Sequence, residues 1–132
     1  MPDLSHNKRK MREALEGTEA EWQRDFIDLC HWLGWKVAHF RPGRTAHGWS
    51  TAVQGDGTGF PDNVCLNVRQ GRLIWVELKA EGKKLAPEQE QWRDWLLACG
   101  EEWYMLYPSQ LDEAGEILRG RKPGKGGGSN CY

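Results

Sequence analysis

The stretch GFPDNVCLNVRQGRLIWVELKAEGKKLAPEQ, residues 59–89, predicts two strands followed by a helix. Two strand-like runs, 63–69 and 72–79, flank a short break at 70–71 that contains glycine. Such a break between strand-like runs is typical of a tight β-hairpin. Pro87 suits the first position of a helix, where no backbone N–H is needed. The other predicted elements are arranged around this unit.

Alternation along the second strand places its charged residues together. Successive side chains of a strand point to opposite faces, so Glu77 and Lys79 share one face at the strand's end. Asp62 begins the preceding strand. In a hairpin the start of one strand lies beside the end of the other, so we expect Asp62, Glu77 and Lys79 to meet. The same alternation turns Leu73 and Trp75 to the face of Glu77, and Ile74, Val76 and Leu78 to the core.

The expected cluster has the composition of a metal site that handles phosphate. Neighbouring carboxylates repel each other unless a cation lies between them. Mg²⁺ and Mn²⁺ suit oxygen ligands and bind through one or two carboxylates plus substrate phosphate, and the Leu78 carbonyl is a further candidate ligand. Such a metal polarises phosphate and lowers the pKa of bound water, and Lys79 could orient that water. The alternative is an exposed strand end with a simple Glu–Lys pair.

The whole chain predicts an α/β domain with the order α-β-β-β-α-β-α. Thr18 and Glu21 form a capping-box pattern that begins the first helix, and Gly34 ends it. The remaining expected elements are a strand over 35–41, a long loop over 42–58, the hairpin, a helix from Pro87 to Gly100, a strand over 103–107 and a helix capped by Ser109 that ends near 118.

Length and composition favour one domain without a membrane segment. The chain has 132 residues, the size of an ordinary single domain. It has no apolar run long enough to span a bilayer and no apolar signal segment, so we expect a cytoplasmic location. None of the four cysteines forms a C-x-x-C pair, which argues against a zinc site. We expect Cys30, Cys65 and Cys99 to be buried and Cys131 to be free.

Charge is unevenly distributed along the chain. The formal net charge is -1, but residues 1–12 carry +3 and residues 119–132 carry +4, which leaves -8 on residues 13–118. We expect residues 1–17 to form a flexible basic arm and residues 119–132 a disordered, basic, glycine-rich tail. A nucleic-acid partner would therefore meet an acidic body, offset by the termini, local basic residues and bound metal. The candidate phosphate contacts are Arg41, Arg44, Lys83 and Lys84.

The ordered set of motifs resembles a known nuclease family over about 18 to 118. Gly59-Phe60-Pro61-Asp62 followed by Glu77-Leu78-Lys79 is similar to the PD-(D/E)XK signature of restriction-endonuclease-like proteins. The surrounding pattern resembles its VRR-NUC branch, in the form of a standalone, virus-type member. That pattern comprises Thr18-Glu19-x-x-x-Gln23, Gly34-Trp35, Leu85-x-Pro87-Glu88-Gln89, Gly100 and Tyr107-Pro108-Ser109.

The resemblance implies a role for each matching residue. Asp62 and Glu77 match the metal-binding acids, Lys79 the catalytic lysine and Gln89 the glutamine of the second helix. Glu19 matches the first-helix glutamate that completes the metal shell, and Glu21 is its rival unless it caps Thr18. Gln23 either bonds near the site or is a solvated helix residue. Ala86 stands where family members often have Ser or Thr, so the second helix lacks a capping side chain.

The family pattern implies a restriction-endonuclease-like fold, with a central mixed sheet flanked by helices and the metal site at the sheet's edge. It implies hydrolysis of DNA phosphodiesters with Mg²⁺ or Mn²⁺, in DNA repair or recombination. Standalone members resemble Holliday-junction resolvases, so we expect a homodimer that acts on branched DNA in the cytoplasm of a host cell or at the nucleoid. The alternatives are a non-catalytic nucleic-acid-binding or packaging protein and a nuclease or nickase for flapped or plain duplex DNA.

Overall fold

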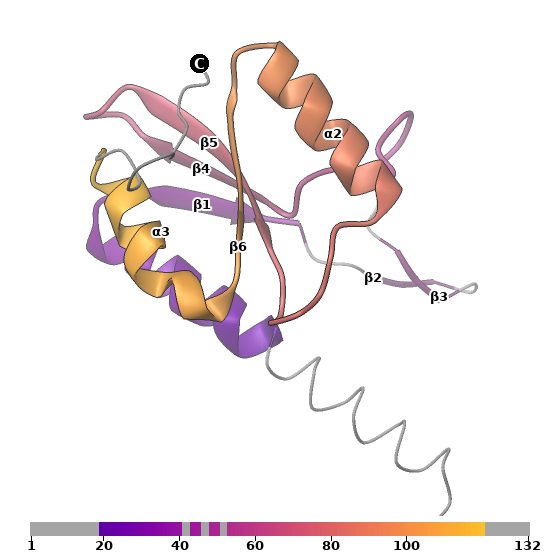
Figure 1. Cartoon of the computed structure of the whole chain (residues 1–132), viewed down its shortest axis with the longest axis horizontal. Coiled ribbons are helices and arrows are strands. Elements are labelled where there is room, and N and C mark those ends of the chain that lie inside the picture. Colours follow the sequence, from indigo (N-terminus) through magenta and orange to yellow (C-terminus); the bar gives the residue numbers. More distant parts are fainter. Residues whose placement is uncertain (1–18, 41–42, 46–47, 51–52, 121–132) are drawn as a thin grey trace, which may run out of the picture.

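The computed structural model describes residues 19–40, 43–45, 48–50 and 53–120. It confirms an α/β fold with the predicted order, and a small additional hairpin lies in the loop (Figure 1). The elements are a helix over 19–32, β1 (Lys36–His39), β2 (Gly43–Thr45), β3 (Gly48–Ser50), β4 (Asn63–Asn67), β5 (Arg72–Leu78), α2 (Pro87–Ala98), β6 (Glu102–Leu106), the 3-10 helix η1 (Pro108–Gln110) and α3 (Leu111–Leu118).

The main sheet is mixed, with the strand order β1-β4-β5-β6. β1 and β5 both pair with β4 in antiparallel fashion, whereas β5 and β6 are parallel. Parallel neighbours need a crossover connection, and α2 supplies it. The β4–β5 register runs from Asn63 opposite Val76 to Asn67 opposite Arg72. Gly71 closes the predicted turn with a φ of 63°, which suits glycine.

Helices cover both faces of this sheet. The helix over 19–32 and α3 lie together on one face (Figure 1), where the hydrophobic core forms. Two tryptophans connect the layers, because the Trp22 indole donates to the Leu106 carbonyl at 3.0 Å and the Trp35 indole donates to the Leu118 carbonyl at 2.9 Å. The buried core consists of Trp22, Phe26, Cys30, Trp35, Cys65, Ile74, Val76, Leu78, Leu106, Ala114, Ile117 and Leu118.

Helix α2 covers the opposite face with a lighter packing. It has no fully buried residue. Its contact with the sheet passes through aromatic rings, because Phe60 meets Trp75 of β5 and Trp92 of α2 edge to face, with ring centroids 5.4 Å and 5.0 Å apart. The face of β5 that carries Trp75 and Glu77 is therefore turned to α2, and the predicted alternation, with Ile74, Val76 and Leu78 in the core, is confirmed.

Three sequence expectations are wrong in detail. The expected loop over 42–58 contains the antiparallel pair β2–β3, which pairs Arg44 with Trp49. Ser109 does not cap the third helix: Gln110 is the N-cap of α3, and the Ser109 backbone N–H donates to the Glu81 carboxylate at 2.7 Å. Cys99 is exposed, because it follows the last turn of the loosely packed α2.

Some expectations lie outside the described residues. They are the capping role of Thr18, the basic arm over 1–17 and the tail from residue 121 onward. Within the described ranges, no helix combines the length and the apolar character needed to cross a membrane.

Candidate active site

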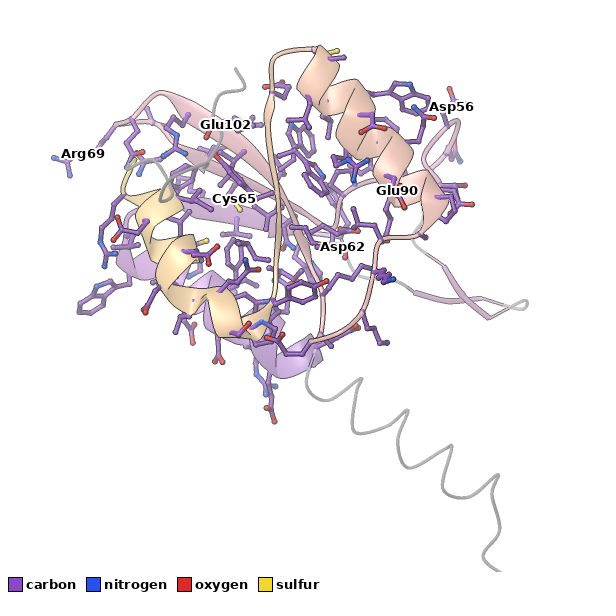
Figure 2. The ribbon with its side chains drawn as sticks, in the orientation of Figure 1. Asp56, Asp62, Cys65, Arg69, Glu90 and Glu102 are labelled. Carbon is purple, nitrogen blue, oxygen red and sulfur yellow. The ribbon has the colours of Figure 1, made fainter. Side chains whose placement is uncertain are left out.

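The candidate site lies where β4 begins and β5 ends. Because Asn63 pairs with Val76, Asp62 lies beside Glu77. The Asp62 backbone N–H donates to Glu77 Oε2 at 3.1 Å. Asp62 faces the α2 side of the sheet, near the N-terminal end of that helix (Figure 2). The site therefore lies at one end of two interior strands, because β4 and β5 are both flanked by other strands of the sheet.

The two carboxyl groups meet in an electrostatically costly arrangement. Glu77 is only 1% exposed, and burial together with the nearby charge of Asp62 raises its pKa to about 8. Burial also raises the pKa of Asp62, although a hydrogen bond with Glu77 and the charges of His39 and Lys79 oppose the shift. Lys79 opposes the shift of Glu77 as well. A bound cation would relieve the cost of ionising this pair.

Gln89 connects α2 to Glu77. Its side-chain amide donates to Glu77 Oε1 at 2.6 Å, and its carbonyl oxygen accepts the Ala86 backbone N–H at 2.8 Å. The second bond is half of a capping box, and it serves a helix whose N-cap, Ala86, has no capping side chain. One amide therefore stabilises the helix start and orients the Glu77 carboxylate.

A glycine brings the loop before β4 into contact with α2. Gly59 has a φ of 82°, and a Cβ at this position would lie 2.5 Å from the Glu88 backbone. Only glycine fits both the conformation and the space. The close approach fixes the loop that leads into Asp62 against the helix that carries Gln89.

The first helix reaches β4 through a reciprocal amide pair. Gln23 Nε2 donates to Asn63 Oδ1 at 2.8 Å, and Asn63 Nδ2 donates to Gln23 Oε1 at 3.3 Å. Asn63 is fully buried and also donates to the Val76 carbonyl at 3.3 Å. Gln23 therefore forms a hydrogen bond near the site and is not merely a solvated helix residue. This bond lies on the sheet face opposite Asp62.

Sequence reasoning missed Asn63 and His39 as neighbours of the site. His39 Nδ1 lies 3.1 Å from the Asp62 carbonyl oxygen, within hydrogen-bonding distance. His39 comes close to Asp62 because β1 pairs with β4, which places His39 opposite Asn63. The two strands are separated in the sequence, and no local sequence pattern predicts their pairing.

The remaining residues predicted for the site differ in their surroundings. Glu19 is near enough to raise the pKa of Asp62, and it forms an ion pair with Lys83 at 3.6 Å. Glu21 is exposed, and so is Lys84. Leu78 ends β5 opposite Leu106, with its side chain in the core. Arg41 and the side chain of Arg44 lie outside what the structure describes.

A cavity of about 300 Å³ opens beside Asp62. Asp62 and Gln89 form part of its wall, and the loop residues Val53, Gly57, Thr58, Gly59 and Phe60 form the rest. The cavity gives a substrate group access to Asp62 from the α2 side of the sheet.

The donor set fits a hard divalent cation that retains water. Over the described part of the chain, no three or more His, Cys, Asp or Glu side chains cluster closely enough to hold a metal by themselves. Mg²⁺ does not require such a cage, because it binds through one or two carboxylates and fills its other positions with water and phosphate. The neighbouring carboxyl groups of Asp62 and Glu77 meet that requirement.

Comparison with known proteins identifies a family. The family model described as the VRR-NUC domain matches residues 9–108. No curated protein and no solved structure matches the chain.

Proposed function

Because the chain belongs to the VRR-NUC domain family, whose members are PD-(D/E)XK nucleases, we propose that it hydrolyses DNA phosphodiesters with Mg²⁺ or Mn²⁺. The observation that carries the proposal is the contact between Asp62 and Glu77, with the positive charge of Lys79 acting on both. Phosphodiester hydrolysis needs such a set, because negative charge accumulates on the phosphate in the transition state.

Each residue has a distinct task in this proposal. Asp62 and Glu77 would hold the metal, with the Leu78 carbonyl and Glu19 as further ligands. When bound, the metal polarises the phosphate and lowers the pKa of water. Lys79 orients the attacking water and offsets the charge that develops on the phosphate. Gln89 is a positioning residue, since it fixes the Glu77 carboxylate from α2.

The proposed substrate is DNA with a branched structure, such as a four-way junction. The acidic body between the termini supports selection of a special shape with few phosphate contacts, rather than tight binding along a duplex. Lys83, Lys84, Arg41 and Arg44 are the proposed phosphate contacts. Symmetric cuts in two strands are made most simply by a two-fold dimer with one site in each subunit, so we propose a homodimer.

The catalytic assignment is tested with substitutions that preserve side-chain shape. Asp62→Asn or Glu77→Gln should each reduce Mg²⁺-dependent cleavage more than about 100-fold, because loss of an outer-shell partner alone costs about 10–100-fold. Asp28→Asn is the matched control, since Asp28 lies exposed on the helix that also carries Glu19. Near-normal cleavage by the Glu77 variant would sink the assignment. A wild-type protein that neither cuts DNA nor binds Mn²⁺ in calorimetry would instead be a non-catalytic binding protein.

The substrate and the dimer are tested separately. Cleavage of a four-way junction, a flap and a plain duplex of matched sequence should be fastest on a branched substrate. Equal rates on all three would reject structure selection while leaving the nuclease assignment intact. Light scattering of the full chain should give twice the mass of one chain, and a monomer that still cuts both strands of a junction would reject the dimer.

A further inference from the structure

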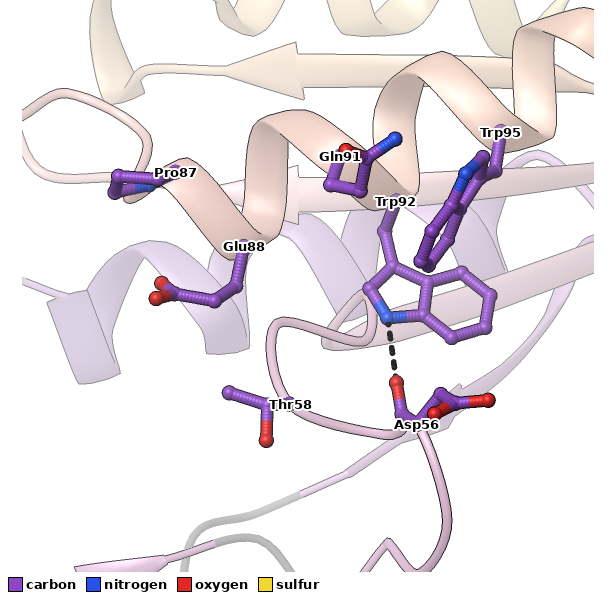
Figure 3. A pocket seen from close by; sticks show the side chains of 7 residues that line it. All are labelled: Asp56, Thr58, Pro87, Glu88, Gln91, Trp92 and Trp95. Atoms are coloured by element: carbon purple, nitrogen blue, oxygen red, sulfur yellow. Dashed lines mark hydrogen bonds between the residues drawn. The ribbon is translucent and has the colours of Figure 1, made fainter.

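A second cavity lies beside the candidate active site, between α2 and the loop that precedes β4. Its volume is about 300 Å³, and Asp56, Thr58, Glu88, Gln91, Trp92 and Trp95 contribute to its wall (Figure 3). Thr58 also lines the cavity at Asp62, so the two cavities share a wall. A ligand that extends from the catalytic centre along α2 would enter this second cavity.

Two indoles form a corner in the second cavity. Trp92 is held in place, since its indole N–H donates to the Asp56 carbonyl at 3.1 Å and its ring meets Phe60 edge to face. The Trp95 ring stands at 84° to the Trp92 ring, with the ring centroids 5.3 Å apart. Trp95 itself is 47% exposed. Figure 3 shows the Trp92 ring face on, with Trp95 beside it and Asp56 at its edge. A rigid aromatic surface of this kind suits a flat ligand ring.

The rim of the corner selects against phosphate. Asp56 and Glu88 are the acidic residues of the cavity wall. Figure 3 shows the Asp56 carboxylate next to the Trp92 ring and the Glu88 carboxylate directed away from the two indoles. No ion pair within the described ranges engages Asp56. Carboxylates accept hydrogen bonds and repel anions. The cavity therefore favours a neutral ring with N–H donors at its edge, and cytosine and adenine present such amino groups.

Resting on the nuclease function proposed above, we propose that this corner binds an unpaired nucleobase of the DNA strand held at the catalytic centre. Stacking on aromatic rings is how proteins commonly hold unpaired bases. A base within an intact duplex is stacked and paired, so it would first have to leave the helix. The substrate class is accordingly DNA with at least one unpaired nucleotide beside the cut, as at a flap or a distorted branch point.

The test measures base-dependent binding without cleavage. The full-length chain in EDTA is titrated with a short deoxycytidine oligomer and with its abasic analogue, which has the same phosphates, and tryptophan fluorescence reports binding. The wild-type protein should bind the base-containing oligomer about tenfold more tightly, as expected for one stacked base. Trp95→Ala should erase the difference. Trp32→Ala is the matched control and should preserve it, because Trp32 is 84% exposed and lies on the helix on the opposite face of the sheet.

A second variant tests the rim independently of the indoles. Asp56→Asn should reduce a preference for the deoxycytidine oligomer over a thymidine oligomer, because an amide donates as well as accepts, and it leaves the backbone carbonyl that holds Trp92 in place. This variant decides the matter if Trp95→Ala fails to fold by circular dichroism. Equal wild-type affinity for the base-containing and abasic oligomers would overturn the proposal. A Trp95→Ala protein that keeps the tenfold difference in affinity would also overturn it, whether or not its oligomeric mass differs from that of the wild type.

Cleavage assays run in parallel separate this proposal from the nuclease function. Base-dependent binding by a wild-type protein that never cuts DNA would retain the base pocket and reject the nuclease. Mg²⁺-dependent cleavage without base-dependent binding would reject the pocket and retain the nuclease.

Discussion

Replacing Glu77 with glutamine should make the metal-free protein more stable at alkaline pH. The Glu77 side chain is buried against Asp62, and its pKa is raised from an ordinary 4.5 to about 8. In the unfolded chain the same carboxyl has its ordinary pKa. Between these two pH values the folded protein holds a proton that the unfolded chain has released.

The sign and size of the effect follow from proton linkage. Since the folded state binds the extra proton, the free energy of unfolding falls as the pH rises from 4.5 to about 8. The slope for one such group is about 1.4 kcal/mol per pH unit, and the whole shift corresponds to at most about 5 kcal/mol. Glu77→Gln removes this titration, so the variant should lose most of the downward slope and exceed the wild type in stability near pH 8.

Urea unfolding in EDTA at several pH values between 5 and 8 measures the effect directly. Asp28→Asn serves as the control, because Asp28 is exposed on the first helix and its substitution should keep the wild-type slope. Adding Mn²⁺ to the wild type should flatten the slope, since a cation between the acids removes the cost of ionising them. Parallel profiles for the wild type and Glu77→Gln in EDTA would refute the electrostatic account of this pair.

Three further predictions concern the supports of the site and of the main sheet. Gly59→Ala should destabilise the fold by about 2–5 kcal/mol, because the new methyl would strain a positive φ and lie 2.5 Å from the α2 backbone; a melting temperature unchanged from wild type would contradict this. Gln89→Ala should lower Mg²⁺-dependent cleavage about 10–100-fold through misorientation of Glu77, and Gln89→Glu should not restore the rate, because a carboxylate cannot donate the bond. Arg72→Ala should cost about 2–4 kcal/mol in urea unfolding, since it breaks a two-bond pair with Glu102, and an unchanged midpoint would show that the pair contributes nothing.

Short-range patterns accounted for most of the fold. Alternation over residues 63–79 and the glycine turn at 70–71 predicted the β4–β5 hairpin, and Pro87 predicted the start of α2. The errors occurred where local patterns compete with tertiary contacts. Ser109 is a good capping residue by type, but its backbone N–H is taken by Glu81 and the helix begins later, after Gln110. Cys99 has apolar neighbours in sequence, but α2 is packed too loosely to bury it.

The proximity of Asp62 and Glu77 could be predicted from the amino-acid sequence, because both belong to one hairpin whose turn sets the register. The bonds from Gln89 to Glu77 and from Gln23 to Asn63 join separate elements, and family resemblance indicated the two glutamines without their partners. The position of His39 and the corner formed by Trp92 and Trp95 had no sequence signal as parts of a site. They depend on how β1 pairs with β4 and how α2 packs on the sheet, and such long-range geometry arises only when the whole chain folds.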